Sequence, residues 1–390
     1  MDTTTTFYLC AAFAFIAGLM GSRFVLPRIA LVAARRRLFD SHDGRKLHKG
    51  NVPRLGGLAF FPCIAIALFM AILLYNKLTG APMLGRILTL EVFTISSALF
   101  ILFLCGLMDD LIGVSYRSKF LIQLICGILV TLSGLYFNDF YGLFGIHALP
   151  LWVGLPFTVL TVVFILNAVN LIDGIDGLAS GLSGIAFLAF GLLFTYLGDR
   201  LHALLSFSAL GVLIPFFHSN VFGQASRGRK LFMGDTGALT IGLLLSVLSV
   251  RLSMADPVKD ARLPGSIVLA FSFLLVPMLD VIRVFIHRIR CGRSPFLPDR
   301  NHIHHKFLDM GFSHRQAMMS IVGLSLAFVV VNVVAIHFVP ITALFVADVV
   351  VWTALNLYWR KKIIHIVGHA VVKLDHRIGR LLDGQFRITG

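Results

Sequence analysis

The sequence has few charged residues, and most of them carry the same sign. Only 14% of its 390 residues are Asp, Glu, Lys or Arg, whereas a soluble protein of this length has about a quarter. There are 19 acidic residues against 34 Lys and Arg, so the formal net charge is +15. This composition excludes an ordinary soluble enzyme of two or three domains.

Cysteine is scarce, and its spacing excludes several kinds of site. The five cysteines show no metal-ligand spacing, and they are Cys10, Cys63, Cys105, Cys126 and Cys291. No Cys pair supports zinc, and the histidine-rich stretch HIHH at 302–305 contains no His-x-x-x-His pattern. The sequence also lacks a soluble domain, a low-complexity segment and a convincing internal repeat, and the last absence argues against an inverted-repeat transporter.

Long apolar runs occupy most of the chain instead. A membrane-spanning helix needs about 20 mostly apolar residues. We predict eleven spans, at 6–26, 56–75, 88–107, 120–137, 152–169, 178–197, 203–222, 237–253, 266–286, 317–338 and 341–359. The first run lacks a charged n-region and a small-residue cleavage site, so we expect a retained helix and not a signal peptide.

The expected fold class is an all-α polytopic membrane protein with its active site at the cytoplasmic face. We expect a transmembrane catalytic domain over 1–360 and a basic amphipathic tail over 361–390. Because apolar and basic positions alternate in the tail at helical spacing, we expect the tail to lie along the cytoplasmic membrane surface.

Basic residues between the predicted spans indicate the orientation. Most Lys and Arg lie in the segments 27–55, 108–119, 170–177, 223–236, 287–316 and the tail. The segment 138–151 has none, whereas 254–265, with Lys259 and Arg262, departs from the pattern. The positive-inside rule therefore places the N-terminus outside and the C-terminus in the cytoplasm.

The net charge of +15 does not indicate a nucleic-acid-binding protein, because it is spread over short loops beside the spans. Attraction to anionic lipid headgroups accounts for this distribution. Phosphorylated substrates on the same face would also be attracted. We expect membrane lipid and anionic small molecules, and no nucleic acid, as partners.

Polar residues collect on the predicted cytoplasmic side. They are Asp109 and Asp110 after the third span, Asn170, Asp173 and Asp176 after the fifth, Asp235 before the eighth, and His302, His304 and His305 after the ninth. The helix dipole disfavours carboxylates at a helix C-terminus, so Asp109 and Asp110 favour a functional role. Taken alone, Asp173 and Asp176 could be turn residues and Asp235 a helix cap. Their gathering on one face favours a site.

The donor types of this predicted site suit magnesium. Carboxylate and amide oxygens are hard ligands, and Mg²⁺ usually keeps several waters and bridges to substrate phosphates. The stretch NLIDGIDGLASG at 170–181 holds two aspartates and no basic residue, so a metal ion is the expected counter-charge. The pair Asp109–Asp110 could keep an attacking oxygen unprotonated. These residues predict a membrane-embedded, magnesium-dependent phosphotransferase; an ion-coupled transporter that uses the same carboxylates is the alternative.

Five motifs, in this order, resemble those of the polyprenyl-phosphate N-acetylhexosamine-1-phosphate transferases. They are RKLHKGNVPRLGG at 45–57, GLMDDLIGV at 106–114, NAVNLIDGIDGLASG at 167–181, KLFMGDTGAL at 230–239 and NHIHHKF at 301–307. The resemblance extends through at least the tenth span. It implies an eleven-helix enzyme that transfers a sugar 1-phosphate from a UDP-sugar to a polyprenyl phosphate and releases UMP. Mg²⁺ is the implied cofactor, with Mn²⁺ as a substitute.

The resemblance also implies catalytic and metal-binding residues. Asp109 and Asp110 match the aspartate pair that deprotonates or positions the lipid phosphate. Asp235, with Asn170 and Asp173, matches the magnesium neighbourhood. Catalytic roles are thus implied for these aspartates.

Further residues match substrate contacts of the family. His304 and His305 match catalytic histidines that contact the diphosphate, with His302 and Arg300 beside them. Phe232 matches an aromatic residue that stacks on uracil. The remaining substrate-binding residues that the resemblance implies are Asp176 in the nucleotide-recognition turn, His48, Lys49, Arg54, Asn220 and Lys230. The stretch FGQASRGR between Asn220 and Lys230 is longer than the usual spacing.

The HIHH loop and PRLGG resemble the WecA type, which uses UDP-GlcNAc, and differ from the TPTMGG and three-histidine run of the MraY, muramyl-pentapeptide branch. We therefore expect GlcNAc-1-phosphate transfer to undecaprenyl phosphate at the bacterial inner membrane. The product would initiate a cell-surface glycan, such as O-antigen or teichoic acid. Another UDP-N-acetylhexosamine or UDP-MurNAc-pentapeptide stays open as the donor, as do a covalent aspartyl intermediate in place of direct attack, and a homodimer.

Overall fold

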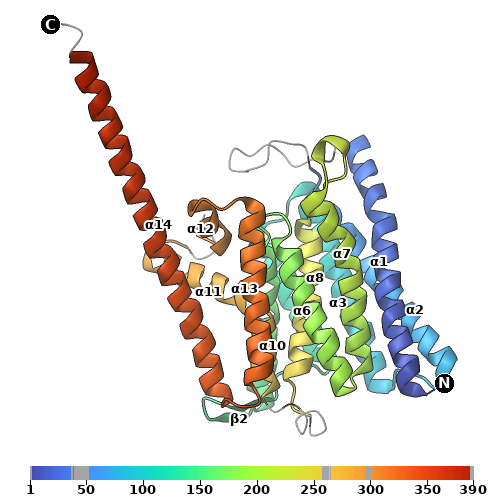
Figure 1. Cartoon of the computed structure of the whole chain (residues 1–390). Helices are drawn as coiled ribbons and strands as arrows, with labels where there is room; N and C mark the ends of the chain where they lie inside the picture. The colour runs from blue at the N-terminus through green and yellow to red at the C-terminus, as the bar shows by residue number, and fades with distance from the viewer. Residues whose placement is uncertain are drawn as a thin grey trace.

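The computed structural model describes residues 2–36, 38, 52–256, 263, 265–294 and 301–386, with the backbone alone for 366–386. This part of the chain is helical apart from one hairpin (Figure 1). Its elements are α1 (Thr3–Arg35), η1 (Gly56–Ala59), α2 (Phe60–Thr79), α3 (Arg86–Ile112), α4 (Tyr116–Leu132), β1 (Asp139–Leu143), β2 (Ile146–Ala148), α5 (Leu151–Ile172), α6 (Leu178–Leu197), α7 (Arg200–Phe222), η2 (Ala225–Arg227), α8 (Gly234–Ser253), α10 (Ser266–Phe273), α11 (Leu275–Arg290), α12 (Ile303–Asp309), α13 (His314–Ala335) and α14 (Ile341–Phe386).

Long apolar helices confirm a polytopic, all-α membrane protein. In the described chain, nine helical stretches are long and apolar enough to cross a membrane, and the bent pair α10–α11 makes a tenth candidate. The 17-residue α4 occupies most of the span predicted at 120–137 but ends at Leu132. Every predicted span therefore contains helix, although the span at 120–137 is helical only as far as Leu132, and most of the helices are longer than the predicted apolar runs.

One predicted span is not straight. The run at 266–286 forms two helices, α10 and α11, which meet at Leu274 with a bend of 74°. Pro277 explains the position of the break, because proline has no N–H for the carbonyl of Phe273 and its ring clashes with that carbonyl. Helical bonding resumes when the N–H of Met278 donates to the carbonyl of Leu274 at 3.1 Å.

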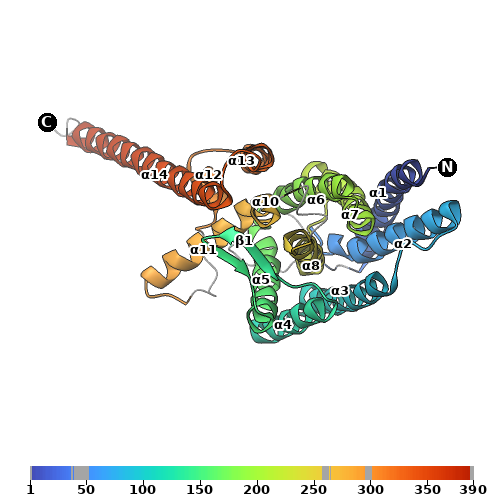
Figure 2. The same ribbon diagram turned by 90° about the horizontal axis from the view of Figure 1, so that it is seen from below.

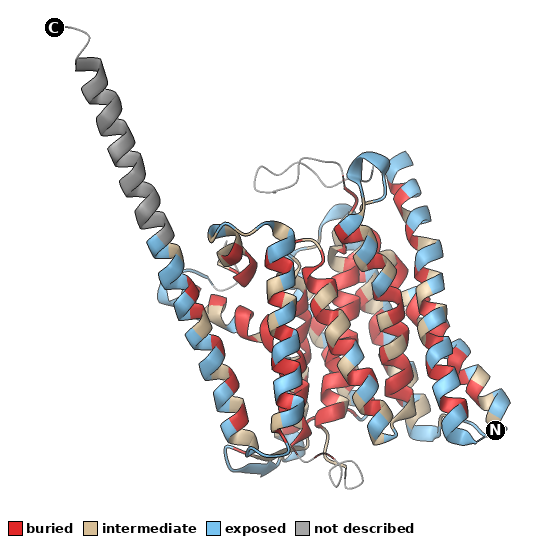
Figure 3. Ribbon diagram, viewed as in Figure 1, coloured by how far each residue is buried: buried red, intermediate tan, exposed pale blue. Residues whose placement is uncertain are grey.

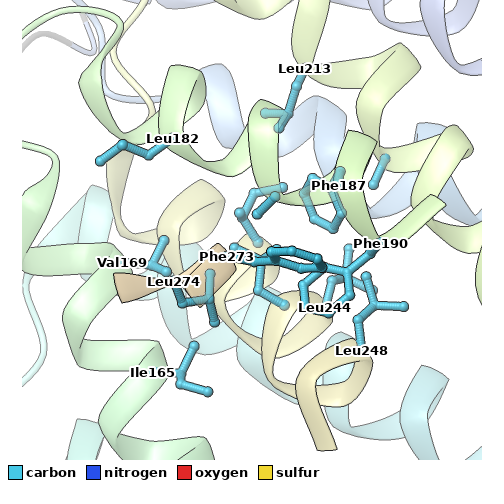
Figure 4. Packing of buried hydrophobic residues seen from close by; sticks show 14 of the residues in the cluster. Ile165, Val169, Leu182, Phe187, Phe190, Leu213, Leu244, Leu248, Phe273 and Leu274 are labelled. Carbon is cyan, nitrogen blue, oxygen red and sulfur yellow. The ribbon is translucent and has the colours of Figure 1, made fainter. Parts of the chain in front are cut away.

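Helix α8 forms the centre of the bundle and is buried along nearly its whole length (Figures 2 and 3). It packs against α2, α3, α5, α6 and α10. Small residues allow these close contacts: a Cβ at Gly242 would lie 3.0 Å from the Cα of Leu166 on α5. Figure 4 shows how Phe190 of α6 and Phe273 of α10 pack beside it, with ring centroids 4.9 Å apart.

The hairpin of β1 and β2 lies at the end of the bundle where α14 begins (Figure 1). Tyr141 and Phe144 have positive φ angles of 57° and 54°. The Phe144 N–H donates to the hydroxyl of Thr342, and its ring packs edge-on against Phe345. These two contacts with α14 offset the backbone strain of the hairpin. The sequence of this segment indicates only a loop.

Helix α14 is unbroken from Ile341 to Phe386, so it crosses the predicted boundary between membrane domain and tail at 360. Its far end and the N-terminal end of α1 lie at opposite ends of the molecule (Figure 1). The association of the tail with a membrane surface stays a prediction.

Candidate active site

Two carboxylates from distant helices meet around one ammonium group. Lys119 at the start of α4 lies 3.0 Å from Asp109 Oδ2 and 2.5 Å from Asp235 Oδ1. Asp109 comes from the last turn of α3 and Asp235 from the first turn of α8. All three side chains are mostly shielded from solvent, with exposed fractions between 14% and 22%. The ion pairs are therefore weakly screened and hold the ends of α3, α4 and α8 together.

Asp110 has a different environment from its neighbour Asp109. Its carboxylate accepts hydrogen bonds from the backbone N–H groups of Asp235 and Thr236 at 2.8 and 2.9 Å, and from the Thr236 hydroxyl at 2.6 Å. The N-cap residue Met233 provides no side-chain cap of its own. Asp110 thus caps α8 from another helix, and its charge faces the positive end of the α8 dipole.

Close backbone packing makes this arrangement possible. A Cβ at Gly106 would lie 2.5 Å from the Cα of Thr236, so α3 can reach α8 only with glycine there. Gly234 has a φ of +70°, and a Cβ on it would lie 2.1 Å from the carbonyl oxygen of Arg54. The segment of Arg54 is held in turn by hydrogen bonds from Phe232 N–H to Pro53 and from Gly56 N–H to Phe232.

Asn170 and Asp173 bring the end of α5 to the same place. The Asn170 side chain donates to Asp235 Oδ1 at 2.5 Å. Asp173 directly follows α5, and burial raises the pKa of its carboxyl to about 7. The negative charges of Asp235 and Asp176 act in the same direction, whereas Arg54 opposes them. A bound cation would favour the ionised form of Asp173.

The Asp176 turn has a basic neighbour that its own segment lacks. Lys230 Nζ lies 2.6 Å from Asp176 Oδ2. Asn220 connects the same two segments: its amide oxygen accepts from Gly177 N–H at 2.6 Å, and its amide nitrogen donates to the carbonyl of Leu231 at 2.8 Å. Asn220 therefore braces the turn against the segment of Lys230, and its predicted contact with the nucleotide stays a prediction.

Phe232 lies between these two groups of residues. Its backbone pairs with the 53–56 segment, and Lys230 Nζ lies 5.8 Å from the centroid of its half-buried ring. An aromatic face next to a lysine and a glycine-rich turn is suitable for stacking a nucleobase.

The histidine motif begins α12, and one histidine packs directly on the turn after α5. A Cβ at Gly174 would lie 2.2 Å from His304 Cε1, so only glycine leaves room for this ring. The ring centroids of His304 and His305 lie 4.2 Å apart. Burial and the neighbouring His305 and His302 lower the pKa of His304 to about 3, so it is neutral at pH 7. Its buried Nδ1 has no hydrogen-bond partner among the described residues.

Three predicted substrate-binding residues, His48, Lys49 and Arg300, lie outside the described residues. The others gather at one end of the bundle, at the ends of α3, α5 and α7, the start of α8, and α12. Sequence patterns did not single out Lys119 or Thr236. A lysine beside an apolar helix start was an available signal for Lys119, whereas no signal pointed to the pairing of Thr236 with Asp110.

The donor set agrees with a hard divalent cation held by few protein ligands. Within the ranges that the structure describes, no three His, Cys, Asp or Glu side chains form a metal cluster. Mg²⁺ in phosphoryl-transfer sites is usually bound by one or two carboxylates plus substrate phosphates. Asp109 and Asp235 already share one cation, the Lys119 ammonium, so their oxygens are oriented towards positive charge.

Comparison with known proteins identifies the family. Residues 92–253 match the family described as Glycosyl transferase family 4. A probable undecaprenyl-phosphate N-acetylglucosaminyl 1-phosphate transferase of Bacillus subtilis is 32% identical over 314 residues, which cover 79% of this chain and 80% of that protein. The chain belongs to this transferase family. Undecaprenyl-phosphate alpha-N-acetylglucosaminyl 1-phosphate transferases of Yersinia pestis and Escherichia coli are each 30% identical, over 74% and 79% of the chain and over 74% and 80% of their own lengths.

Membership of the sugar-1-phosphate transferase family explains why the carboxylates and histidines gather at one end. The matched residues 92–253 contain the aspartates of α3, α5 and α8 as well as Lys119. The α12 histidines lie beyond that stretch but contact it at Gly174.

Proposed function

We propose that the protein transfers N-acetylglucosamine 1-phosphate from UDP-GlcNAc to undecaprenyl phosphate, which yields undecaprenyl-diphosphate-GlcNAc and UMP. The names of the relatives support this donor and acceptor. The observation that carries the proposal is the meeting of Asp109 and Asp235 at Lys119, beside the turn that bears Asp173 and His304. Carboxylates, a lysine and histidines at one point are suited to phosphoryl transfer between two anions.

In the proposed reaction, an oxygen of the lipid phosphate attacks the β-phosphorus of UDP-GlcNAc. The new bond joins that oxygen to the β-phosphorus, and the bond to the α-phosphate oxygen breaks, so UMP leaves. Asp109 keeps the attacking phosphate deprotonated and aligned, and Lys119 offsets the repulsion between anions. His304 is neutral and donates hydrogen bonds to the diphosphate through a ring N–H.

Uracil recognition is assigned to the residues around Phe232 and the Asp176 turn. Phe232 stacks on the base, while Asp176 and Lys230 contact the nucleoside and its phosphate. Direct attack is preferred over a covalent aspartyl intermediate, because Asp109 is already bound to Lys119 and to the Val114 N–H.

Magnesium is the proposed cofactor, with Asp235 and Asp173 as its carboxylate ligands and Asn170 beside them. Bound there, the ion would offset negative charge on the donor diphosphate and on the phosphate of the departing UMP. We propose eleven membrane spans in a bacterial inner membrane, an external N-terminus, and an active site at the cytoplasmic face, where a nucleotide sugar is available. The product would initiate a cell-surface glycan.

The test is a reconstituted reaction. Purified protein in detergent receives Mg²⁺, undecaprenyl phosphate and each of several UDP-sugars, and the products are UMP and a lipid identified by its mass. We expect turnover with UDP-GlcNAc and none without a divalent ion, with Mn²⁺ as a substitute. Asp235→Asn should lower kcat by a factor of about 100 or more, since it removes a charged group at the reacting phosphates.

The matched control is Asp139→Asn on β1 in the hairpin at the other end of the bundle, which should keep wild-type turnover. Full activity of Asp235→Asn would refute the assignment of the site. If the product formed only with a different UDP-sugar, the proposed donor would be wrong, whereas the proposed sugar-1-phosphate transfer would still hold.

A further inference from the structure

Helix α11 carries a buried carboxylate that is hydrogen-bonded to the start of the histidine motif. Asp280 is fully buried, with 0% exposure. One oxygen accepts from His302 Nδ1 at 2.9 Å, and the other accepts from the Ile303 N–H at 3.1 Å. The same oxygen is paired with Arg283 Nη2 at 2.7 Å. Asp280 thus binds the N-cap residue of α12 and its first backbone N–H.

Arg283 is the second side chain of α11 that holds the segment before α12. Besides its pairing with Asp280, its guanidinium donates to the carbonyl of Asn301. Two side chains one turn apart on α11 therefore hold three consecutive residues, 301–303. A buried carboxylate is costly unless its charge is paired and its oxygens are hydrogen-bonded, and here both conditions are met by the segment that it holds and by Arg283.

The contacts of Asp280 and Arg283 affect the site through the ring of His304, which contacts both His302 and Gly174. His302 and His304 are parallel, with an interplanar angle of 5° and centroids 6.0 Å apart. His304 in turn packs against Gly174, next to Asp173. Because Asp280 fixes the position of His302, it also fixes where the His304 ring meets the turn after α5. His305 follows, since its ring packs against that of His304.

We propose that Asp280 is a positioning residue for the transferase reaction, which holds His302 and the start of α12 so that His304 and His305 meet the donor diphosphate. The inference rests on the proposed function. Asp280 acts through the histidines and does not itself contact the substrate. Its chemistry resembles that of a carboxylate that orients a histidine in many enzymes, where the hydrogen bond to Nδ1 fixes the ring.

The deciding variant is Asp280→Asn. Asparagine has nearly the same volume, but it is uncharged and has a single acceptor oxygen. It therefore cannot accept hydrogen bonds from both His302 and the Ile303 N–H through separate oxygens, as Asp280 does. If the amide nitrogen of the introduced asparagine faces His302 Nδ1, that ring nitrogen must accept a hydrogen bond, so the proton of a neutral His302 has to move to Nε2. We expect kcat/KM for UDP-GlcNAc to fall by about 10–100-fold, the range for lost outer-sphere partners.

The pattern of the kinetic change separates positioning from general damage. The KM for undecaprenyl phosphate should stay at the wild-type value, while kcat and the KM for UDP-GlcNAc change. The matched control is Asp348→Asn, another buried carboxylate, which accepts from Asn332 at 3.0 Å between α14 and α13. This control should keep wild-type kinetics for both substrates.

Arg283→Gln is the second variant in case Asp280→Asn does not fold. It releases Asn301 but leaves the Asp280–His302 bond, and it should lower kcat/KM for UDP-GlcNAc at least threefold with an unchanged lipid KM. Wild-type kinetics in the folded variants, or an equal loss in Asp348→Asn, would overturn the proposal. An inactive wild-type protein would instead refute the proposed function, so the two failures are distinguishable.

Discussion

Asp109 and Asp110 are neighbours in the chain, but their carboxylates bind different groups. Asp109 is part of the ion-pair cluster with Lys119 and Asp235, whereas Asp110 caps α8 with three hydrogen bonds. We therefore expect Asp110→Asn to lower the melting temperature in detergent more than Asp109→Asn does. A lost cap leaves buried N–H groups of α8 unsatisfied, which costs about 1–3 kcal/mol.

The measurement is thermal unfolding of both variants in the same detergent, together with kcat. Asp109→Asn should reduce turnover and lower the melting temperature less, because asparagine can still accept from the Val114 N–H and Lys119 keeps its ion pair with Asp235. A lower melting temperature for Asp109→Asn than for Asp110→Asn would show that the Asp110 cap does not stabilise α8.

Gly174 determines whether His304 can reach the α5 turn. A methyl group there would lie 2.2 and 2.3 Å from His304 Cε1 and Nε2, so Gly174→Ala must displace the ring. A displacement of about 1 Å at reacting groups can cost about 100-fold in rate, and we expect kcat to fall by a factor between about 10 and 100. Gly323→Ala on α13 is the control, since nothing lies within 4 Å of its added Cβ. Equal turnover in the two variants would contradict the contact.

At the residue scale, the sequence predicts which residues lie together better than it predicts which groups they bind. Asp109, Asp173, Asp235 and His304 lie at one end of the bundle, as their placement on one side of the predicted spans indicates. The stretch 170–181 lacks a basic residue, yet Lys230, from the segment between η2 and α8, is paired with Asp176. Such pairings depend on how distant helices pack, which no local pattern encodes.

At the scale of helices, a second buried ion-pair network joins α3, α7 and α8 away from the site. His202 lies 2.7 Å from both Glu91 and Asp199, and Arg251 lies 2.8 Å from Asp199. His202→Leu should be strongly destabilising, by about 3–5 kcal/mol, because Glu91 is left buried without its partner. The double variant Glu91→Leu/His202→Leu should recover part of that stability, since no orphaned charge remains.

Thermal unfolding in detergent measures both effects, and a double variant no more stable than His202→Leu would contradict them. UMP release per folded molecule should stay near the wild-type value in both variants, because the network includes none of the site residues. A loss of turnover without loss of stability would indicate a coupling that the static contacts do not explain.

Elements were predictable where a single local property decides them. Each predicted apolar run forms helix over most of its length, and the run at 120–137 stops being helical at Leu132. The break at Leu274 depends on one proline within an apolar run, and hydropathy is insensitive to it. The β1–β2 hairpin is stabilised by Thr342 and Phe345, which are far away in sequence, so its segment could be predicted only as a loop.

For the whole molecule, the natural cysteines provide a test of orientation. Cys291 at the end of α11 is exposed, whereas Cys10, Cys63, Cys105 and Cys126 are buried. If the active-site end faces the cytoplasm, as the distribution of Lys and Arg predicts, a membrane-impermeant maleimide should label the protein in inside-out vesicles but not in sealed right-side-out vesicles. Cys291→Ser should abolish this labelling.

The reciprocal probe is His147→Cys, placed in the Cys291→Ser background. His147 is exposed on β2, at the opposite end of the molecule from the histidine motif. It should be labelled only in right-side-out vesicles. If both probes gave the reverse pattern, the site would face away from the cytoplasmic pool of nucleotide sugars, and the proposed donor would have to be abandoned even though the carboxylates and histidines still meet.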